Sequence, residues 1–190
     1  MRISSFRNLL VLFFLFLSIS IYAQDLVEKS SGEYFTIYAQ EGVDLLGVAY
    51  KIKLGSNFYL YQDSSSQIFR GGSPREVLAE NIDSLFKEVS DILDMHLYSY
   101  HGDIKIFLTQ KNLENEFFEL FGEELKTKAF YCRESNAIYL AADSIKVGIL
   151  TQEVADAIVS HYFVVMPPDK VKNVLFEHVK YSIENKLNKE

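Results

Sequence analysis

The sequence predicts an α+β domain in which helices pack against a small mixed β-sheet. Short apolar segments with strand-like alternation come first, a long amphipathic helix follows, and further short strands precede two helices at the C-terminal end. No Pro-rich linker, internal repeat or low-complexity tract divides the 190 residues. We therefore expect a single domain over residues 25–190, preceded by a leader at residues 1–24.

The leader has the composition of a secretory signal peptide. Arg2 and Arg7 form a positive segment, residues 9–17 are an unbroken apolar run, and Ala23 supplies a small residue for cleavage after Ala23 or Gln24. The alternative is an uncleaved anchor, but the apolar run is near the short end for a bilayer span, which takes about 20 residues. We expect an exported protein, periplasmic or extracellular, with no stable membrane insertion after cleavage.

Charge and cysteine content narrow the possible partners. The formal net charge is −7 at pH 7, and an acidic surface repels the phosphates of nucleic acids and anionic lipids, so nucleic acid is excluded as a partner. Cys132 is the single cysteine and cannot form an internal disulfide. Because it follows Phe130 and Tyr131 in a strand-like run, we expect it to be buried.

The first half of the domain contains two predicted β segments and one helix. Residues 33–39 alternate as a strand does, residues 45–61 are rich in Tyr, Phe, Ile and Val around a Gly-Ser-Asn turn and predict a hairpin, and residues 62–72 are a polar loop. Ser73 and Glu76 can form a capping box around Pro74, which starts a helix. The apolar positions of that helix recur at three- and four-residue steps and predict one buried face; they are Leu78, Ile82, Leu85, Val89 and Ile92.

The second half continues with short strands and ends in helices. Residues 104–108 read as a strand, and residues 111–121 as a short helix closed by Gly122. Two further strands are expected at residues 128–132 and 136–141. The two C-terminal helices are predicted at residues 146–165 and 169–187, with a Pro-Pro turn between them.

The first of these two helices carries polar residues at the spacing of a zinc-peptidase motif. In H-E-x-x-H, two histidines one helical turn apart hold Zn²⁺, and the glutamate between them activates water. The same frame here reads Q-E-x-x-D, with Gln152, Glu153 and Asp156. The glutamate is present, and both histidines are replaced.

Together with the order of the elements, this helix resembles the peptidase MA-like domains of the gluzincin metallopeptidases, which have a zincin-like fold. The resemblance rests on the strands at residues 34–38, 104–108 and 137–140, on the long helix between the first two of these strands, and on the motif helix with its Pro-Pro turn. It implies that Glu153 is a vestigial general base. It also implies that Gln152 and Asp156 stand at metal-ligand positions, with the third at Asn173 or, in the other register, at Glu177.

These substitutions remove the chemistry that the resemblance would otherwise imply. Amide oxygens are poor zinc donors, and without zinc the water beside Glu153 is not acidified. We therefore expect no zinc and no cofactor, and a non-catalytic pseudopeptidase that binds a peptide or protein partner in the cell envelope. One alternative is an active hydrolase with an unusual calcium-like or manganese-like site around Glu153 and Asp156. Another is a purely structural envelope protein.

Two other interpretations of polar residues in this sequence remain open. The stripe formed by Gln152, Glu153, Asp156 and Ser160 is also what the solvated face of an ordinary helix looks like. The pair His96 and His101, which brackets a short connection before a strand, offers a weak metal-binding pattern.

Overall fold

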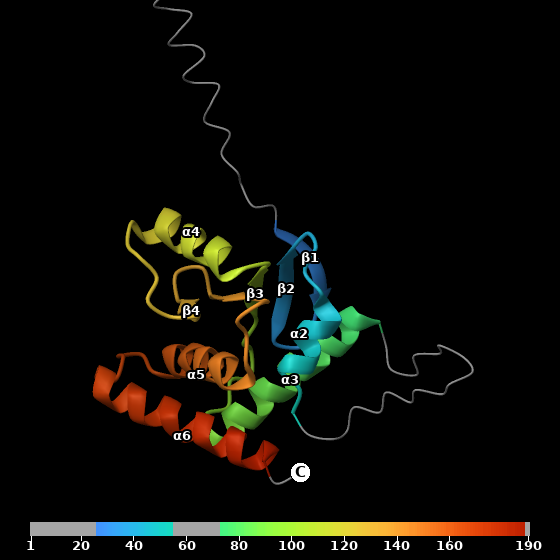
Figure 1. Cartoon of the computed structure of the whole chain (residues 1–190). Helices are drawn as coiled ribbons and strands as arrows, with labels where there is room; N and C mark the ends of the chain where they lie inside the picture. The colour runs from blue at the N-terminus through green and yellow to red at the C-terminus, as the bar shows by residue number, and fades with distance from the viewer. Residues whose placement is uncertain (1–25, 55–72, 189–190) are drawn as a thin grey trace, which may run out of the picture.

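The computed structural model describes residues 26–54 and 73–188 of the chain. Within them, an α+β fold combines a five-stranded mixed sheet with five helices (Figure 1). The strands are β1 (Leu26–Ser31), β2 (Phe35–Gln40), β3 (Gly102–Phe107), β4 (Ala129–Cys132) and β5 (Ala137–Ala141). The helices are α2 (Leu45–Lys51), α3 (Pro74–Leu93), α4 (Gln110–Phe121), α5 (Val147–Tyr162) and α6 (Asp169–Leu187). The predicted leader and the predicted loop at residues 62–72 lie outside the described residues.

The sheet has the strand order β1-β2-β3-β5-β4. The three central strands are parallel, and the outer strands β1 and β4 run antiparallel to their neighbours. Ile37, Ile104 and Ile138 lie side by side across the centre, and all three are fully buried. The predicted small mixed sheet is thus confirmed, and β4 is an edge strand of the described part of the chain.

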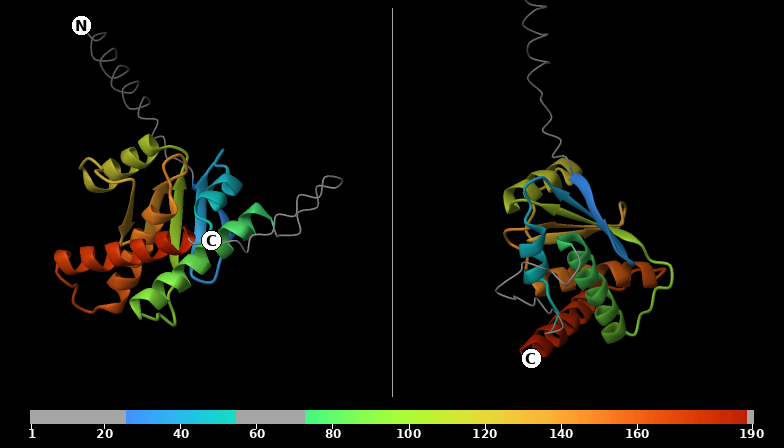
Figure 2. Two further views of the ribbon diagram at one scale, coloured as in Figure 1. Left: turned by 60° about the horizontal axis from the view of Figure 1, so that its bottom comes forward. Right: turned by 90° about the vertical axis from the view of Figure 1, so that its right-hand side faces the viewer.

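Helices cover both faces of this sheet unequally. The helices α2, α3, α5 and α6 lie on one side of the sheet, with α6 packed against α5 and α3, and α4 lies on the other side (Figures 1 and 2). The larger core therefore lies between the sheet and these four helices. The smaller core under α4 consists of Phe107, Leu113, Cys132, Ala137, Tyr139 and Ala141. Cys132 is buried, as expected.

The predicted start and buried face of α3 are confirmed. The Ser73 hydroxyl accepts a hydrogen bond from the Glu76 backbone amide at 3.4 Å, and the Glu76 carboxylate accepts one from the Ser73 amide at 2.6 Å. This reciprocal capping satisfies two backbone donors that the first helical turn leaves open. Leu85 lies on the apolar face and is fully buried in the larger core.

The predicted hairpin at residues 45–61 is wrong where the structure describes it. Leu45–Lys51 is the helix α2, and residues 55–61 lie outside the described residues. The Asp44 carboxylate accepts a hydrogen bond from the Gly47 amide at 3.0 Å and caps the helix. Val48, Ala49 and Ile52 then fall on one helical face that is buried in the larger core. The apolar composition that indicated strands is thus arranged at helical spacing.

Two further differences from the sequence predictions concern exposed segments. Strand β1, which was not predicted, is rich in polar residues and pairs only at the edge of the sheet. Helix α5 ends at Tyr162, three residues before the predicted end, and Val164 and Val165 are 96% and 81% exposed in the connection that follows. In the described ranges, no helix combines the length and apolar character needed to cross a membrane.

Candidate functional site

The candidate site is the polar seam of α5, which lies between strand β4 and helix α6. Helix α5 packs against both elements, and its partner α6 runs beside it in Figures 1 and 2. Gln152, Glu153 and Asp156 are half-buried, and Ser160 is buried. The seam is therefore not the fully solvated face that the simpler interpretation expected.

The first degenerate ligand position faces helix α6. The Gln152 side-chain amide donates a hydrogen bond from Nε2 to the Glu177 Oε1 atom at 3.1 Å. Asn173, the other residue considered for the third ligand position, is exposed and lies one helical turn earlier on α6. The structure thus brings Gln152 and Glu177 together, and their hydrogen bond uses the amide group at the position where the resemblance implies a zinc-binding imidazole.

Glu153 faces the opposite side of the seam, toward β4. Burial, followed by the nearby Asp156 carboxylate, raises the pKa of Glu153 to about 7, while the backbone amide of Tyr131 acts in the other direction. A carboxyl group with a pKa near neutrality is half-protonated at physiological pH. Glu153 thus has the titration behaviour that acid–base chemistry uses.

Asp156 lies between the two sides of the seam. Its Oδ1 atom accepts a hydrogen bond from the Ser160 hydroxyl at 3.2 Å. Burial raises the pKa of Asp156, whereas the Lys172 ammonium and the Ser160 hydroxyl oppose that shift. Among the described residues, neither Asp156 nor Glu153 has a cation within ion-pair distance. Two half-buried carboxyl groups therefore share the seam without a direct counter-charge.

Strand β4 contributes Tyr131, an aromatic residue that sequence patterns did not select. The Tyr131 hydroxyl donates to the Asn136 Oδ1 atom at 3.1 Å and lies 3.4 Å from Nδ1 of His161. Burial and the Asp156 carboxylate raise the pKa of Tyr131 to about 12. On the far side, the His161 ring meets the edge of Tyr100, with centroids 4.9 Å apart. The seam thus ends in a cluster of aromatic rings that only the folded chain assembles.

The residues present do not fit the zinc ion that the resemblance would imply. No group of three or more His, Cys, Asp or Glu side chains in the described ranges is arranged to hold a metal. The two histidines of the weak metal pattern have different partners: His101 contacts the Thr36 hydroxyl at 2.9 Å, and His96 lies near Asp91 and Asp94. Neither the seam nor this pair offers the nitrogen-rich tetrahedral donor set that zinc prefers.

The raised pKa of Glu153 predicts a pH-dependent stability that a single substitution removes. A pKa raised from 4.5 to about 7 means that the folded protein binds this proton more tightly than the unfolded chain. The stabilisation is complete below pH 4.5 and is lost as the pH rises to about 7. Relative to Glu153→Gln, wild type should therefore lose about 3 kcal/mol of unfolding free energy between pH 4.5 and pH 8.

Urea denaturation of both proteins at several pH values in this window measures the difference. Glu177→Gln serves as the control, because Glu177 is exposed on α6. We expect that control to follow the pH dependence of wild type. Parallel curves for wild type and Glu153→Gln would show that Glu153 titrates as it does in the unfolded chain.

Comparison with known proteins does not add to this geometry. No family model, no curated protein and no solved structure matches the chain.

Proposed function

We propose that this protein is an exported, non-catalytic gluzincin-like domain that binds an extended peptide, or an extended segment of a protein partner, in the cell envelope. The observation that carries the proposal is the position of edge strand β4 beside the half-buried carboxyl groups of α5. A backbone edge and a polar seam then form two sides of one binding surface.

The edge strand supplies the main-chain contacts. In the described part of the chain, β4 pairs with β5 on one side only, and its Tyr131 amide faces the Glu153 carboxylate. An extended segment can add to such an edge through backbone hydrogen bonds, with side chains reading its alternate residues. Glu153 occupies the position where the incoming strand would pair, so the segment must displace it or use its carboxyl group as a partner.

The degenerate ligand positions support binding without hydrolysis. The Gln152 amide is hydrogen-bonded to Glu177, and Asp156 is the single carboxyl group among Gln152, Asp156 and Asn173. A zinc-activated water is the main source of rate in the peptidases that this domain resembles. Casein and generic peptides are therefore expected to remain uncleaved when the purified protein is added.

Peptide selection tests the proposal directly. Random dodecapeptides displayed on phage are panned against the folded protein, and the selected sequences are synthesised and titrated. We expect binding to slow hydrogen exchange at the β4 amides and to weaken about tenfold or more in Glu153→Lys, which crowds the edge. Glu184→Lys, an exposed position on α6, is the control for the added charge. If the selected peptides bind Glu153→Lys as tightly as wild type and leave hydrogen exchange at the β4 amides unchanged, the binding surface lies elsewhere.

A second candidate function is favoured by the titration of Glu153. Two neighbouring carboxyl groups, one with a pKa of about 7, are the arrangement that acid–base hydrolysis uses. Peptide cleavage that depends on Ca²⁺ or Mn²⁺ and is lost in Glu153→Gln would support this hydrolase. The absence of both cleavage and peptide selection would favour the structural envelope protein instead.

A further inference from the structure

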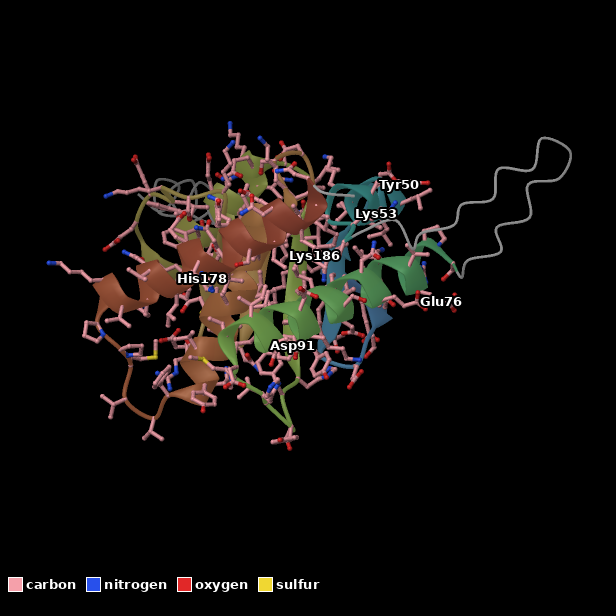
Figure 3. All side chains as sticks on the ribbon, turned by 90° about the horizontal axis from the view of Figure 1, so that it is seen from below. Tyr50, Lys53, Glu76, Asp91, His178 and Lys186 are labelled. Atoms are coloured by element: carbon pink, nitrogen blue, oxygen red, sulfur yellow. The ribbon has the colours of Figure 1, made fainter. Side chains whose placement is uncertain are left out.

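A separate pocket lies where α3 ends and the chain turns toward β3, beside Asp91, which Figure 3 labels on α3. Its volume is about 480 Å³, within the range of small-ligand sites. It shares no residue with the α5 seam. Tyr100 separates the two sites, because it lines the pocket and its ring also contacts the His161 ring edge-to-face, with centroids 4.9 Å apart. The lining residues that the binding argument uses most are Glu33, Lys87, Asp91, Leu97 and Tyr98.

Stacked aromatic rings form one side of this pocket. Tyr34 stacks on Phe86 with centroids 4.2 Å apart, and Phe86 stacks on Tyr100 at 5.0 Å. Phe86 and Tyr100 are buried, so the packing fixes their ring positions. Tyr98 is 98% exposed. Its ring is therefore free to cover a ligand that enters the pocket.

The charges around the pocket favour a cation. Glu33 and Asp91 line it, and Asp91 and Asp94 lie 3.8 Å and 3.7 Å from the two ring nitrogens of His96. The Asp83 carboxylate, just outside, accepts hydrogen bonds from the backbone amides of Glu33 and Tyr34. Lys87 is the single lysine or arginine among the lining residues. The lining thus contains two carboxylates, Glu33 and Asp91, and one lysine, which disfavours phosphates and other anions.

The contacts of Lys87 show that a carboxylate and an aromatic ring at this pocket can bind an ammonium group. Its ammonium nitrogen lies 2.6 Å from the Glu33 carboxylate and 5.5 Å from the centroid of the Tyr34 ring. A carboxylate and an aromatic face together attract a primary ammonium group by charge and by cation–π interaction. Asp91 and Tyr98 likewise supply a carboxylate and an aromatic ring to the pocket. No lysine or arginine of the lining pairs with Asp91, whose neighbour is His96.

We propose that this pocket binds the ammonium or guanidinium group of a basic side chain. Asp91 supplies the counter-charge, Tyr98 supplies the aromatic face, and Leu97 contacts the alkyl part of the ligand. This proposal does not depend on the peptide site at β4, because any ligand that carries such a group can enter. Anionic ligands are excluded by the same charges.

Titration with small model compounds followed by NMR tests the pocket. The probes are the N-acetyl methylamides of lysine and arginine, with the N-acetyl methylamide of norleucine as a neutral control of similar size. We expect both basic probes to shift the backbone amide signals around Asp91 and Tyr98, with weak affinity, and the norleucine compound to leave them unchanged. Equal shifts with the norleucine compound, or none with either basic probe, would overturn the proposal.

Substitutions test whether binding depends on the pocket residues rather than on any exposed carboxylate or aromatic ring. Asp91→Asn and Tyr98→Ala should each weaken binding of the lysine probe about fivefold. Glu114→Gln on α4 and Tyr181→Ala on α6 are matched controls at exposed positions, and they should change nothing. Equal effects of the controls and the pocket variants would contradict the assignment.

The sharpest variant is Lys87→Met, for which we expect a gain of affinity. It keeps the length and apolar stem of the side chain, and it frees the Glu33 carboxylate and the Tyr34 ring for the ligand. The lysine probe should then bind about fivefold more tightly. Weaker binding in Lys87→Met would mean that Lys87 is itself a ligand contact and that the pocket takes an anion, which would overturn the proposal.

Discussion

Replacing both Gln152 and Asp156 with histidine is expected to give this protein a one-to-one zinc site that the wild-type chain lacks. The two imidazoles would stand one helical turn apart on α5, the spacing at which zinc peptidases hold their metal. Glu177 already lies beside position 152, with its carboxylate 3.1 Å from the Gln152 amide nitrogen. Structural zinc sites reach binding free energies of about 10 kcal/mol or more, so competition with a coloured chelator should detect the new site.

Two additional variants identify the third ligand. Adding Glu177→Gln to the double histidine variant should abolish most of the zinc affinity if Glu177 is that ligand. Adding Asn173→Glu instead tests the register favoured by the resemblance, in which the third ligand lies one turn earlier. Zinc bound by the variant with Asn173→Glu and not by the double variant would assign the ligand to position 173.

The wild-type protein is the control that decides the larger question. It should purify without stoichiometric zinc and should not acquire it in the titration. Zinc bound one-to-one by wild type would contradict the pseudopeptidase interpretation. Circular dichroism of each variant shows whether a failure to bind zinc reflects a lost fold.

The second large effect is expected from Leu85→Ala. Leu85 is fully buried between α3 and the sheet in the larger core. Truncation removes apolar contacts and leaves a cavity, so the free energy of unfolding should fall by about 2–5 kcal/mol. Urea denaturation monitored by circular dichroism measures the change.

Leu120→Ala is the matched control for this substitution. Leu120 is on α4 and is 47% exposed, so the same truncation there should change the unfolding free energy by about 0.5 kcal/mol or less. Equal midpoints for Leu85→Ala and wild type would show that α3 packs through a different face. A large effect of both variants would instead point to a general loss of helix stability.

Local sequence patterns were sufficient to predict the helices for which capping residues and apolar spacing indicate the same element. The capping box at Ser73 and the apolar spacing through Leu85 predicted α3, and both are confirmed. Gly122 was predicted to close α4 and has a φ of 69°, the left-handed conformation that glycine adopts most easily. These signals depend on neighbours in the chain, so they can be read without knowing the fold.

Local sequence patterns failed to predict the secondary structure of segments that are stabilised by residues far away in the chain. Residues 45–51 are apolar enough for either a strand or a helix, and packing against α3 with the Asp44 cap selects the helix. Strand β1 is polar and was missed because its stability comes from pairing with β2, which a local window does not see.

The sequence by itself determined that the histidines of the zinc motif are absent, because ligand identity is a property of single positions such as Gln152 and Asp156. The tertiary structure alone decided what surrounds them. It placed the Glu153 carboxyl group in a half-buried seam beside Asp156 and the Tyr131 amide, and it joined Gln152 to Glu177. Desolvation and charge–charge interaction depend on which distant groups come together, so the titration of Glu153 could not be predicted from the order of the residues.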